Sequence, residues 1–203
     1  MELIVDLLGG LGLFLFGMNF MSQGLQKAAG ARLRSILEAM TKNKIIAVLF
    51  GALFTAIIQS SGATTVMVVS FVNTGIMSLA QSVGIIFGAN IGTTITSQLV
   101  AFNLTGVAPF ILFVGAVFVM FGKKPMLKKV GEVLLGFGAL FMGISLMKDA
   151  MADLKNYQAV MDALGSMDNP IVGILFGTAI TVVVQSSSVT VSILLLMASQ
   201  GLI

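Results

Sequence analysis

The sequence of 203 residues contains no cysteine and no histidine, and only 9% of its residues are charged. Without cysteine there is no disulfide framework and no thiolate chemistry. The lack of histidine removes the commonest general base and metal ligand. Charged residues make up about 25% of a typical soluble domain, whereas 57% of this chain is hydrophobic. The composition therefore predicts an integral membrane protein.

A polar triplet, Gln59-Ser60-Ser61, lies in the middle of a long apolar stretch, and it returns as Gln185-Ser186-Ser187. The offset is 185 minus 59, or 126. When residues 45–64 are aligned with 171–190 at this offset, nine of twenty pairs are identical. The same register joins four upstream pairs, which are Gly10/Gly136, Gly12/Gly138, Gly17/Gly143 and Met21/Met147. An ungapped match over such a length indicates one duplicated unit.

Each triplet divides an apolar segment, 45–80 or 171–203, into two short halves. A complete crossing needs about 20 residues, and each half of the first segment has only about 14 to 18. We therefore expect helical hairpins that enter and leave on one side, with the triplet at membrane depth. Irregular backbone at that depth is tolerated only where it is buried in protein or lines a cavity. The two hairpin tips are thus the first candidate binding site.

A second polar, glycine-rich interruption, Gly88-Ala-Asn-Ile-Gly-Thr-Thr94, lies within the segment 83–101, and we expect the helix to break there. Further membrane helices are predicted at 3–22, 107–122 and 131–147. The loops are expected at 27–44, 122–129 and 148–168, with a short interfacial helix in the first of them.

Charge separates these loops into two classes. Loops 27–44 and 122–129 are rich in lysine and arginine, whereas loop 148–168 is acidic. Three crossings separate the start of one unit from the start of the next, so the second copy is expected to be inverted. The positive-inside rule then assigns both basic loops to the cytoplasm and the N-terminus to the outside. We read the basic residues as topology signals and expect no binding to nucleic acid.

These features predict three parts, with the first transmembrane repeat at 1–122, a basic cytoplasmic linker at 123–130 and a second, incomplete repeat at 131–203. The expected fold is an all-α inverted-repeat secondary transporter with helical hairpins that carry the Gln-Ser-Ser motifs. It would lie in the cytoplasmic (inner) membrane as a multi-pass protein, in contact with the lipid bilayer.

The chemistry of the tips follows from their neutral residues, because neither Gln-Ser-Ser segment contains Asp, Glu, Lys or Arg. Helix N-termini with hydroxyl groups suit an oxyanion. Carbonyl, hydroxyl and amide oxygens suit a hard cation such as sodium. Sodium-coupled anion uptake follows, but composition does not choose the anion, so a carboxylate transporter stays open. An enzyme is not expected, since a serine nucleophile would need a nearby base.

The opening GLGLFLFGMNFMSQGLQKAAG, the two motifs QSSGATT and QSSSVTV, and GANIGTT together resemble the type II sodium–phosphate cotransporter family and its bacterial members. The resemblance covers essentially the whole chain. It implies uptake of inorganic phosphate coupled to sodium, with no organic cofactor. The substrate and sodium residues that it implies are Gln59, Ser60, Ser61, Gln185, Ser186, Ser187 and Ser188, with Thr64, Thr65, Asn90, Thr93 and Thr94 as weaker candidates from the flanking motifs. Among them, Gln59, Ser60, Gln185 and Ser186 would bind Na+.

The chain departs from the family pattern in two ways. Gly62 stands where the fuller motif has serine, so the two sites are chemically unequal. Adding 126 to 88 predicts a second GANIGTT near position 214, beyond Ile203. We expect either a piece truncated within the second repeat, or another chain, as in a homodimer, that supplies the missing wall. A membrane subunit that does not transport is the remaining alternative.

Overall fold

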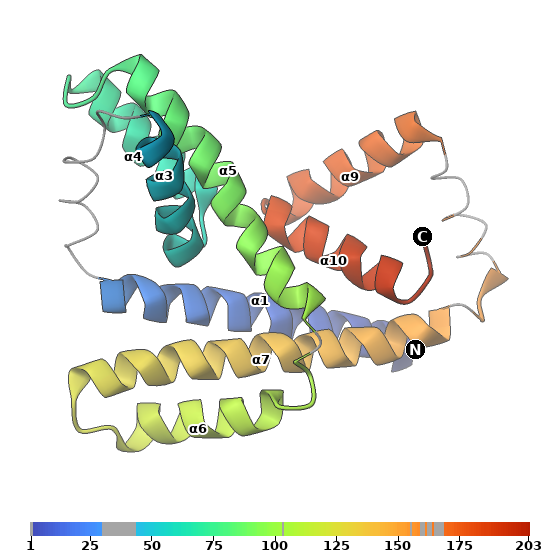
Figure 1. Ribbon diagram of the computed structural model, residues 1–203. Helices are drawn as coiled ribbons and strands as arrows, with labels where there is room; N and C mark the ends of the chain where they lie inside the picture. Colours follow the sequence, from blue (N-terminus) through green and yellow to red (C-terminus); the bar gives the residue numbers. More distant parts are fainter. Residues whose placement is uncertain are drawn as a thin grey trace.

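The computed structural model describes residues 2–29, 44–102, 104–154, 156–158, 161, 164 and 169–203, and every regular element among them is an α-helix (Figure 1). The expected all-α fold is confirmed. In chain order the helices are α1 (Glu2–Ala29), α3 (Lys44–Ile58), α4 (Ser61–Asn73), α5 (Leu79–Ala101), α6 (Ala108–Phe121), α7 (Pro125–Leu154), α9 (Pro170–Val184) and α10 (Ser187–Ser199).

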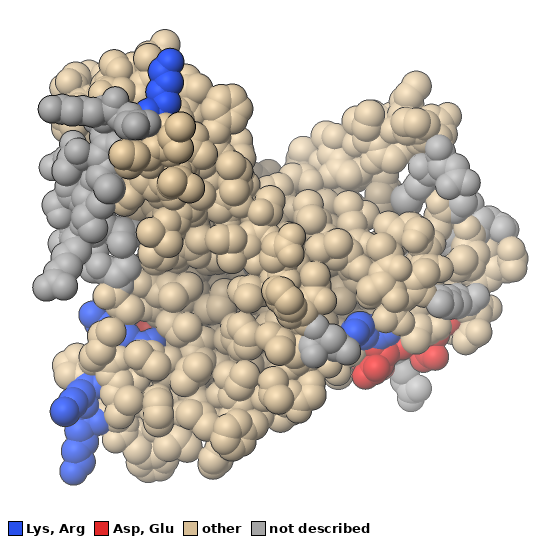
Figure 2. Space-filling model, in the orientation of Figure 1, with Lys and Arg blue, Asp and Glu red and all other residues tan. Residues whose placement is uncertain are grey.

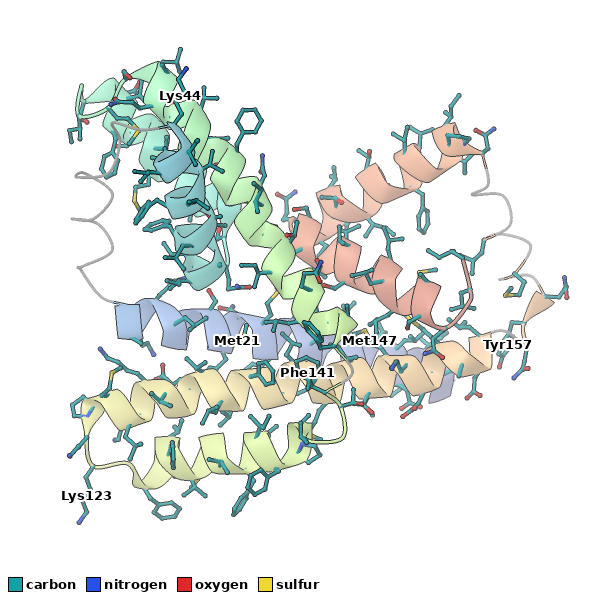
Figure 3. All side chains as sticks on the ribbon, viewed as in Figure 1. Met21, Lys44, Lys123, Phe141, Met147 and Tyr157 are labelled. Carbon is teal, nitrogen blue, oxygen red and sulfur yellow. The ribbon has the colours of Figure 1, made fainter. Side chains whose placement is uncertain are left out.

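Helices α1 and α7 form the most extensive helix pair, with α6 packed along α7 to complete a layer (Figure 1). A Cβ atom at Gly17 would collide with the backbone of Leu140, and one at Gly136 would collide with the backbone of Met21. The missing side chains therefore let the two helix backbones approach closely, as small residues commonly do in membranes. Met21, Phe141 and Met147 lie along this contact and are almost completely buried (Figure 3).

The predicted hairpins are confirmed in both copies. In the first, α3 and α4 are separated only by Gln59 and Ser60, and in the second, α9 and α10 are separated only by Gln185 and Ser186. Each first arm has 15 residues and each second arm 13. At 1.5 Å per residue the longer arms span about 22 Å, less than the roughly 30 Å of a bilayer core. Neither arm could cross a membrane alone.

The expected break at 88–94 is wrong, because α5 runs through this motif as one helix. The glycines of the motif serve helix packing. A Cβ at Gly88 would collide with the Val48 carbonyl oxygen of α3, and a Cβ at Gly92 would collide with that of Ala52. The hydroxyls of Thr93 and Thr94 donate to carbonyls within α5 itself, at Ala89 and Ile91. These bonds satisfy the polar side chains without opening the helix.

Three helix boundaries also differ from the expectation. The first helix continues beyond residue 22 to Ala29. Helix α7 begins at Pro125, so Lys128 and Lys129 lie on a helix where a loop was expected. Proline is favoured in the first turn of a helix because the backbone N–H groups of that turn have no acceptor within the helix, so a residue without an N–H loses no hydrogen bond there. At its other end α7 continues through residues 148–154, where a loop was expected. The interfacial helix expected within 27–44 falls mainly on residues outside the described part.

Three of the described helices are long and apolar enough to cross a membrane, which are α1, α5 and α7. Many large apolar side chains are exposed on the outside of the molecule, among them Phe110, Phe113 and Met120 on α6. Figure 2 shows that the charged residues of this face gather at its edges, with a broad uncharged region between them. This distribution is typical of a helical membrane protein.

Candidate functional site: two hairpin tips on α5

The first tip is a helix break with a fixed backbone. Gln59 adopts the left-handed conformation, with φ of 61°, and Ser60 is extended. The Gln59 backbone N–H donates to the Thr55 carbonyl over 2.6 Å, and its side-chain Nε2 donates to the Ala56 carbonyl over 2.5 Å. Ser60 caps α4, because its Oγ accepts from the backbone N–H of Ala63 over 3.2 Å. The tip thus ends one helix and begins the next within two residues.

The second tip repeats this geometry. Gln185 is left-handed, with φ of 56°, and its backbone N–H donates to the Thr181 carbonyl over 2.7 Å. Its Nε2 donates to the Val182 carbonyl over 2.6 Å. Ser186 is extended and caps α10 through Val189. Non-glycine residues rarely adopt a left-handed backbone, so its occurrence at both copies marks a strained turn that the surrounding bonds maintain.

A pair of threonines joins the two arms of each hairpin. Thr55 and Thr64 are completely buried, and their hydroxyl oxygens lie 2.9 Å apart. Thr64 also donates to the Ser60 carbonyl over 3.0 Å, so Thr55 is the donor to Thr64. In the second hairpin the Thr181 hydroxyl oxygen lies 3.1 Å from that of Thr190 and 2.8 Å from the Gly177 carbonyl oxygen, and Thr190 donates to the Ser186 carbonyl over 3.1 Å. Thr64 therefore braces the tip from inside the hairpin.

The remaining predicted residues lie on the first turns of α4 and α10 and on α5. Ser61, Thr65 and Ser188 are partly exposed, and Ser187 is exposed. Asn90 and Thr94 are exposed on α5, whereas Thr93 is partly buried. Helix α5 packs against both arms of the first hairpin and against α10 of the second, and it lies between the two hairpins in Figure 1. The helix that carries the third motif thus packs against helices of both hairpins.

The second hairpin carries an open groove of about 440 Å³ along α9 and α10. Its wall includes Gly177, Thr181, Ser187 and Thr190. The same side of the first hairpin is covered, because a Cβ at Gly51, the counterpart of Gly177, would collide with Ile85 of α5. A Cβ at Gly177 would meet no atom within 4 Å.

Sequence reasoning missed two residues of α1 that contact the first tip. Ser22 donates to the Ile58 carbonyl over 2.7 Å, and Gln26 donates to the same oxygen over 3.0 Å. Their spacing of four residues puts them on one face of α1. This spacing was the available signal, but it does not reveal which element the face contacts.

The arrangement offers neutral hydrogen-bonding groups and no ionisable side chain. Both tips combine serine hydroxyls, a glutamine amide and the N-terminal N–H groups of a helix. Among the described residues, no group of three or more acidic, cysteine or histidine side chains could hold a metal ion. The oxygen atoms at the tips instead suit a hard, monovalent cation, and the helix N-termini suit an anion.

A model of the Na+/Pi-cotransporter family matches residues 13–149, which include α7 up to Asp149, the first hairpin and all of α5. The chain belongs to the Na+/Pi-cotransporter family. This is a family of transporters, and its name gives phosphate and sodium as what its members move. The expected family and the membrane character of the chain are therefore confirmed.

Curated relatives extend the similarity beyond the family match. "Putative inorganic phosphate export protein YjbB" of Escherichia coli K12 is 28% identical over 201 residues, which are 98% of this chain and 37% of the relative. The uncharacterized protein YqeW of Bacillus subtilis is 32% identical over 191 residues, covering 94% of this chain and 62% of YqeW. Sodium-dependent phosphate transport protein 2A of Rattus norvegicus is 33% identical over 102 residues, 49% of this chain and 16% of the relative.

The chain spans 37% of the length of YjbB and 62% of that of YqeW. No solved structure matches the chain at a significant level.

Proposed function

We propose that this chain carries sodium-coupled transport of inorganic phosphate, with both ions held at the two Gln-Ser-Ser tips. The observation that supports this most strongly is the repetition of one strained backbone at Gln59 and Gln185, followed in each case by a serine-capped helix. Backbone strain persists where the surrounding structure over-determines it, and it is concentrated at functional sites. Membership of the Na+/Pi-cotransporter family supports phosphate and sodium as the two ions.

The phosphate would bind to the N-terminal ends of α4 and α10. The first backbone N–H groups of a helix have no partner within the helix, and they carry partial positive charge. Ser61, Ser187 and Ser188 are on these first turns and add hydroxyl donors. A phosphate anion can thus be bound without a buried lysine or arginine, which would be costly in a membrane.

Sodium would bind to oxygen atoms of Gln59, Ser60, Gln185 and Ser186. Each glutamine uses its amide nitrogen on a carbonyl three residues earlier, so the amide is oriented by its own helix. When bound, sodium would supply positive charge that offsets the charge of the phosphate. Thr64 and Thr65 would support the first tip, and Asn90, Thr93 and Thr94 of α5 would form the wall between the two sites.

We propose that the two units are inverted repeats related by an approximate two-fold axis across the α1–α7 pair. A Cβ at Gly10 would contact Met147, and a Cβ at Gly136 would contact Met21. At the offset of 126, Gly10 corresponds to Gly136 and Met21 corresponds to Met147. Exchanging the two copies therefore turns the Gly10–Met147 contact into the Gly136–Met21 contact. Equivalent helices in antiparallel contact are what an inverted repeat requires, and such repeats are typical of secondary transporters.

The open groove on α9 would be covered by a helix equivalent to α5. In the first unit this helix fills the corresponding side through glycines at 84, 88 and 92. By the offset of 126 its counterpart would begin at 79 plus 126, or 205. We propose that a complete site needs this second helix, from a longer chain or from another copy.

The direction of transport has two candidates. Sodium gradients usually drive uptake, which is the direction we propose. The name of the E. coli relative favours export instead. A coupled transporter runs in either direction according to the gradients, so flux must be measured with sodium gradients of both signs. A sodium-coupled carboxylate transporter is the further alternative, since the tips would also bind a carboxylate.

The test is radiolabelled phosphate flux in proteoliposomes, with inward and outward sodium gradients. We expect flux that follows the sodium gradient and is abolished by Gln59→Ala or Ser187→Ala. Ser199→Ala, near the far end of α10, is the matched control and should leave the flux unchanged. Sodium-dependent flux of radiolabelled succinate, with no sodium-dependent flux of phosphate, would establish the carboxylate alternative.

If the 203-residue chain folds but moves no phosphate, the same assay is repeated with a chain extended by a helix equivalent to α5. We expect the extended chain to transport. Absence of sodium-dependent flux from the folded, extended chain would contradict the proposed function.

A further inference from the structure

The end of α3 is held by two polar side chains of α1. Ser22 Oγ donates to the Ile58 carbonyl oxygen over 2.7 Å. Gln26 Nε2 donates to the same oxygen over 3.0 Å and to Ser22 Oγ over 3.0 Å. The three groups form a closed triangle that joins α1 to the last residue of α3, directly before the left-handed Gln59.

This contact satisfies an atom that its own helix cannot. The last four carbonyls of a helix lack intrahelical donors. At the end of α3, Gln59 supplies donors to the carbonyls of Thr55 and Ala56. The Ile58 carbonyl instead receives donors from a helix more than thirty positions earlier in the sequence. Because this carbonyl has no donor within α3, the two bonds from α1 fix where α3 ends relative to α1.

Neighbouring polar residues of α1 do not share this role. Gln23 donates to Asn19 over 2.9 Å, within α1. The second unit does not repeat the pair either. Adding 126 to 22 and to 26 gives Lys148 and Ala152, and alanine has no polar side-chain atom. The duplication therefore conserves the two tips and their threonine pairs but not this contact from the preceding long helix.

We infer that Ser22 and Gln26 are positioning residues that anchor the first Gln-Ser-Ser tip to α1, and that the second tip has no equivalent anchor on α7. This inference rests on the proposed function for its meaning in transport, because it makes the first hairpin the fixed half of the site. The second hairpin is then the half that moves relative to its long helix. The anchor itself is a structural claim that can be tested without transport.

The absence of native cysteine makes any introduced cysteine a unique reporter. Gly62 follows the first tip and faces open space, so Gly62→Cys reports access to that tip. Ser188→Cys, at 62 plus 126, is the matched reporter on the second tip. The purified, cysteine-substituted chain is labelled in lipid nanodiscs with a water-soluble maleimide, and the labelling rate is measured for each reporter with and without a change in α1.

We expect Ser22→Ala or Gln26→Ala to raise the labelling rate at Gly62→Cys by about three- to tenfold, the factor that corresponds to the net loss of about one hydrogen bond. The labelling rate at Ser188→Cys should stay within about twofold of its value without the change in α1. A twofold change in rate corresponds to less than about 0.5 kcal/mol. Gln23→Ala, on the same helix, should change neither rate. Ser22→Thr restores a hydroxyl and should restore the slow rate.

Two outcomes would overturn the inference. One is an unchanged rate at Gly62→Cys in the double variant Ser22→Ala/Gln26→Ala. The other is an equal rise at both reporters, which would indicate general loosening of the fold. If one single variant fails to fold by circular dichroism, the other carries the test. Because the readout is labelling, a chain that transports no phosphate still gives a decisive result, and so failure of the proposed function is distinguishable.

Discussion

The hydroxyl chain inside each hairpin explains how a residue in the arm controls the tip. Thr55 donates to Thr64, and Thr64 donates to the carbonyl of the capping residue Ser60. Thr181, Thr190 and Ser186 occupy the same positions in the second hairpin, where the Thr181 hydroxyl also reaches the Gly177 carbonyl. Each serine is thus held on its carbonyl side by threonine while its hydroxyl caps the following helix. The tip serines have a defined position even before any ion binds.

Thr55→Val tests this chain. Valine keeps the shape of the side chain but removes the donor to Thr64, so we expect a loss of about 1 kcal/mol in stability. The measurement is thermal unfolding in detergent micelles, followed by circular dichroism. Thr178→Val is the matched control, because the exposed Thr178 bonds only within α9, to the Ile174 carbonyl. Equal melting temperatures for the two variants would contradict a bracing role for Thr55.

Glycines on one face of α5 let this helix pack closely against the first hairpin. Gly84, Gly88 and Gly92 recur every four residues, and each lies against α3. This spacing aligns them along one side of the helix, so α3 can approach the α5 backbone. Asn90 and Thr94 are exposed on another face. The glycine-rich motif therefore presents polar side chains on one face because its other face is closely packed.

Gly88→Ala should separate α5 from the first hairpin. The new methyl group would meet the Val48 carbonyl and the Ala52 amide nitrogen, which are backbone atoms of a helix and cannot move cheaply. We expect destabilisation of about 1–3 kcal/mol by overpacking. Gly12→Ala is the control, since a Cβ there meets no atom within 4 Å, and it should be neutral or slightly stabilising. Chemical denaturation of the reconstituted protein compares them, and a Gly88→Ala chain as stable as the control would refute the packing argument.

The whole molecule has an unequal charge distribution along the α1–α7 pair. Lys27 pairs with Glu132 over 2.7 Å and Lys129 donates to the Lys27 carbonyl, so these basic residues gather where α1 ends. Asp149 and Asp153 lie near the opposite end of α7. Figure 2 shows most of the basic residues at the left of the view, and the acidic residues at the lower right with basic atoms beside them, and Figure 3 labels Lys123 and Tyr157 at these opposite sides. The first hairpin begins at the side of Lys123, whereas the chain ends at the other side (Figure 1).

This distribution predicts a topology with Lys123 in the cytoplasm and Asp153 outside. Single cysteines at the two positions, both exposed, would report their sides through a membrane-impermeant maleimide. We expect Asp153→Cys to be labelled in intact cells and Lys123→Cys to be labelled only in inverted vesicles. Labelling of both from one side would contradict the predicted crossing of α7. Labelling of each from the side opposite to that expected would contradict the predicted orientation of α7.

The sequence alone determined the class of protein, the duplication, the hairpins and the residues of the two tips. Composition sets the solvent, and a polar triplet in the middle of a short apolar segment leaves a helical hairpin as the simplest arrangement. These are local properties of the chain, so they can be inferred from the sequence without knowledge of the tertiary contacts. The left-handed turn at the glutamines was not predicted, because no glycine marks it and the bonds to Thr55 and Ala56 form only after α3 has folded.

Only the tertiary structure decided what the glycines and the polar residues of α1 do. The motif at 88–94 could equally have broken α5 or packed it, and the closeness of Val48 and Ala52 settles which. The polar face of Ser22 and Gln26 gains meaning only from the end of α3 that it reaches. In both cases the deciding partner lies tens of residues away in sequence, and helical periodicity reveals a face but not the surface that the face meets.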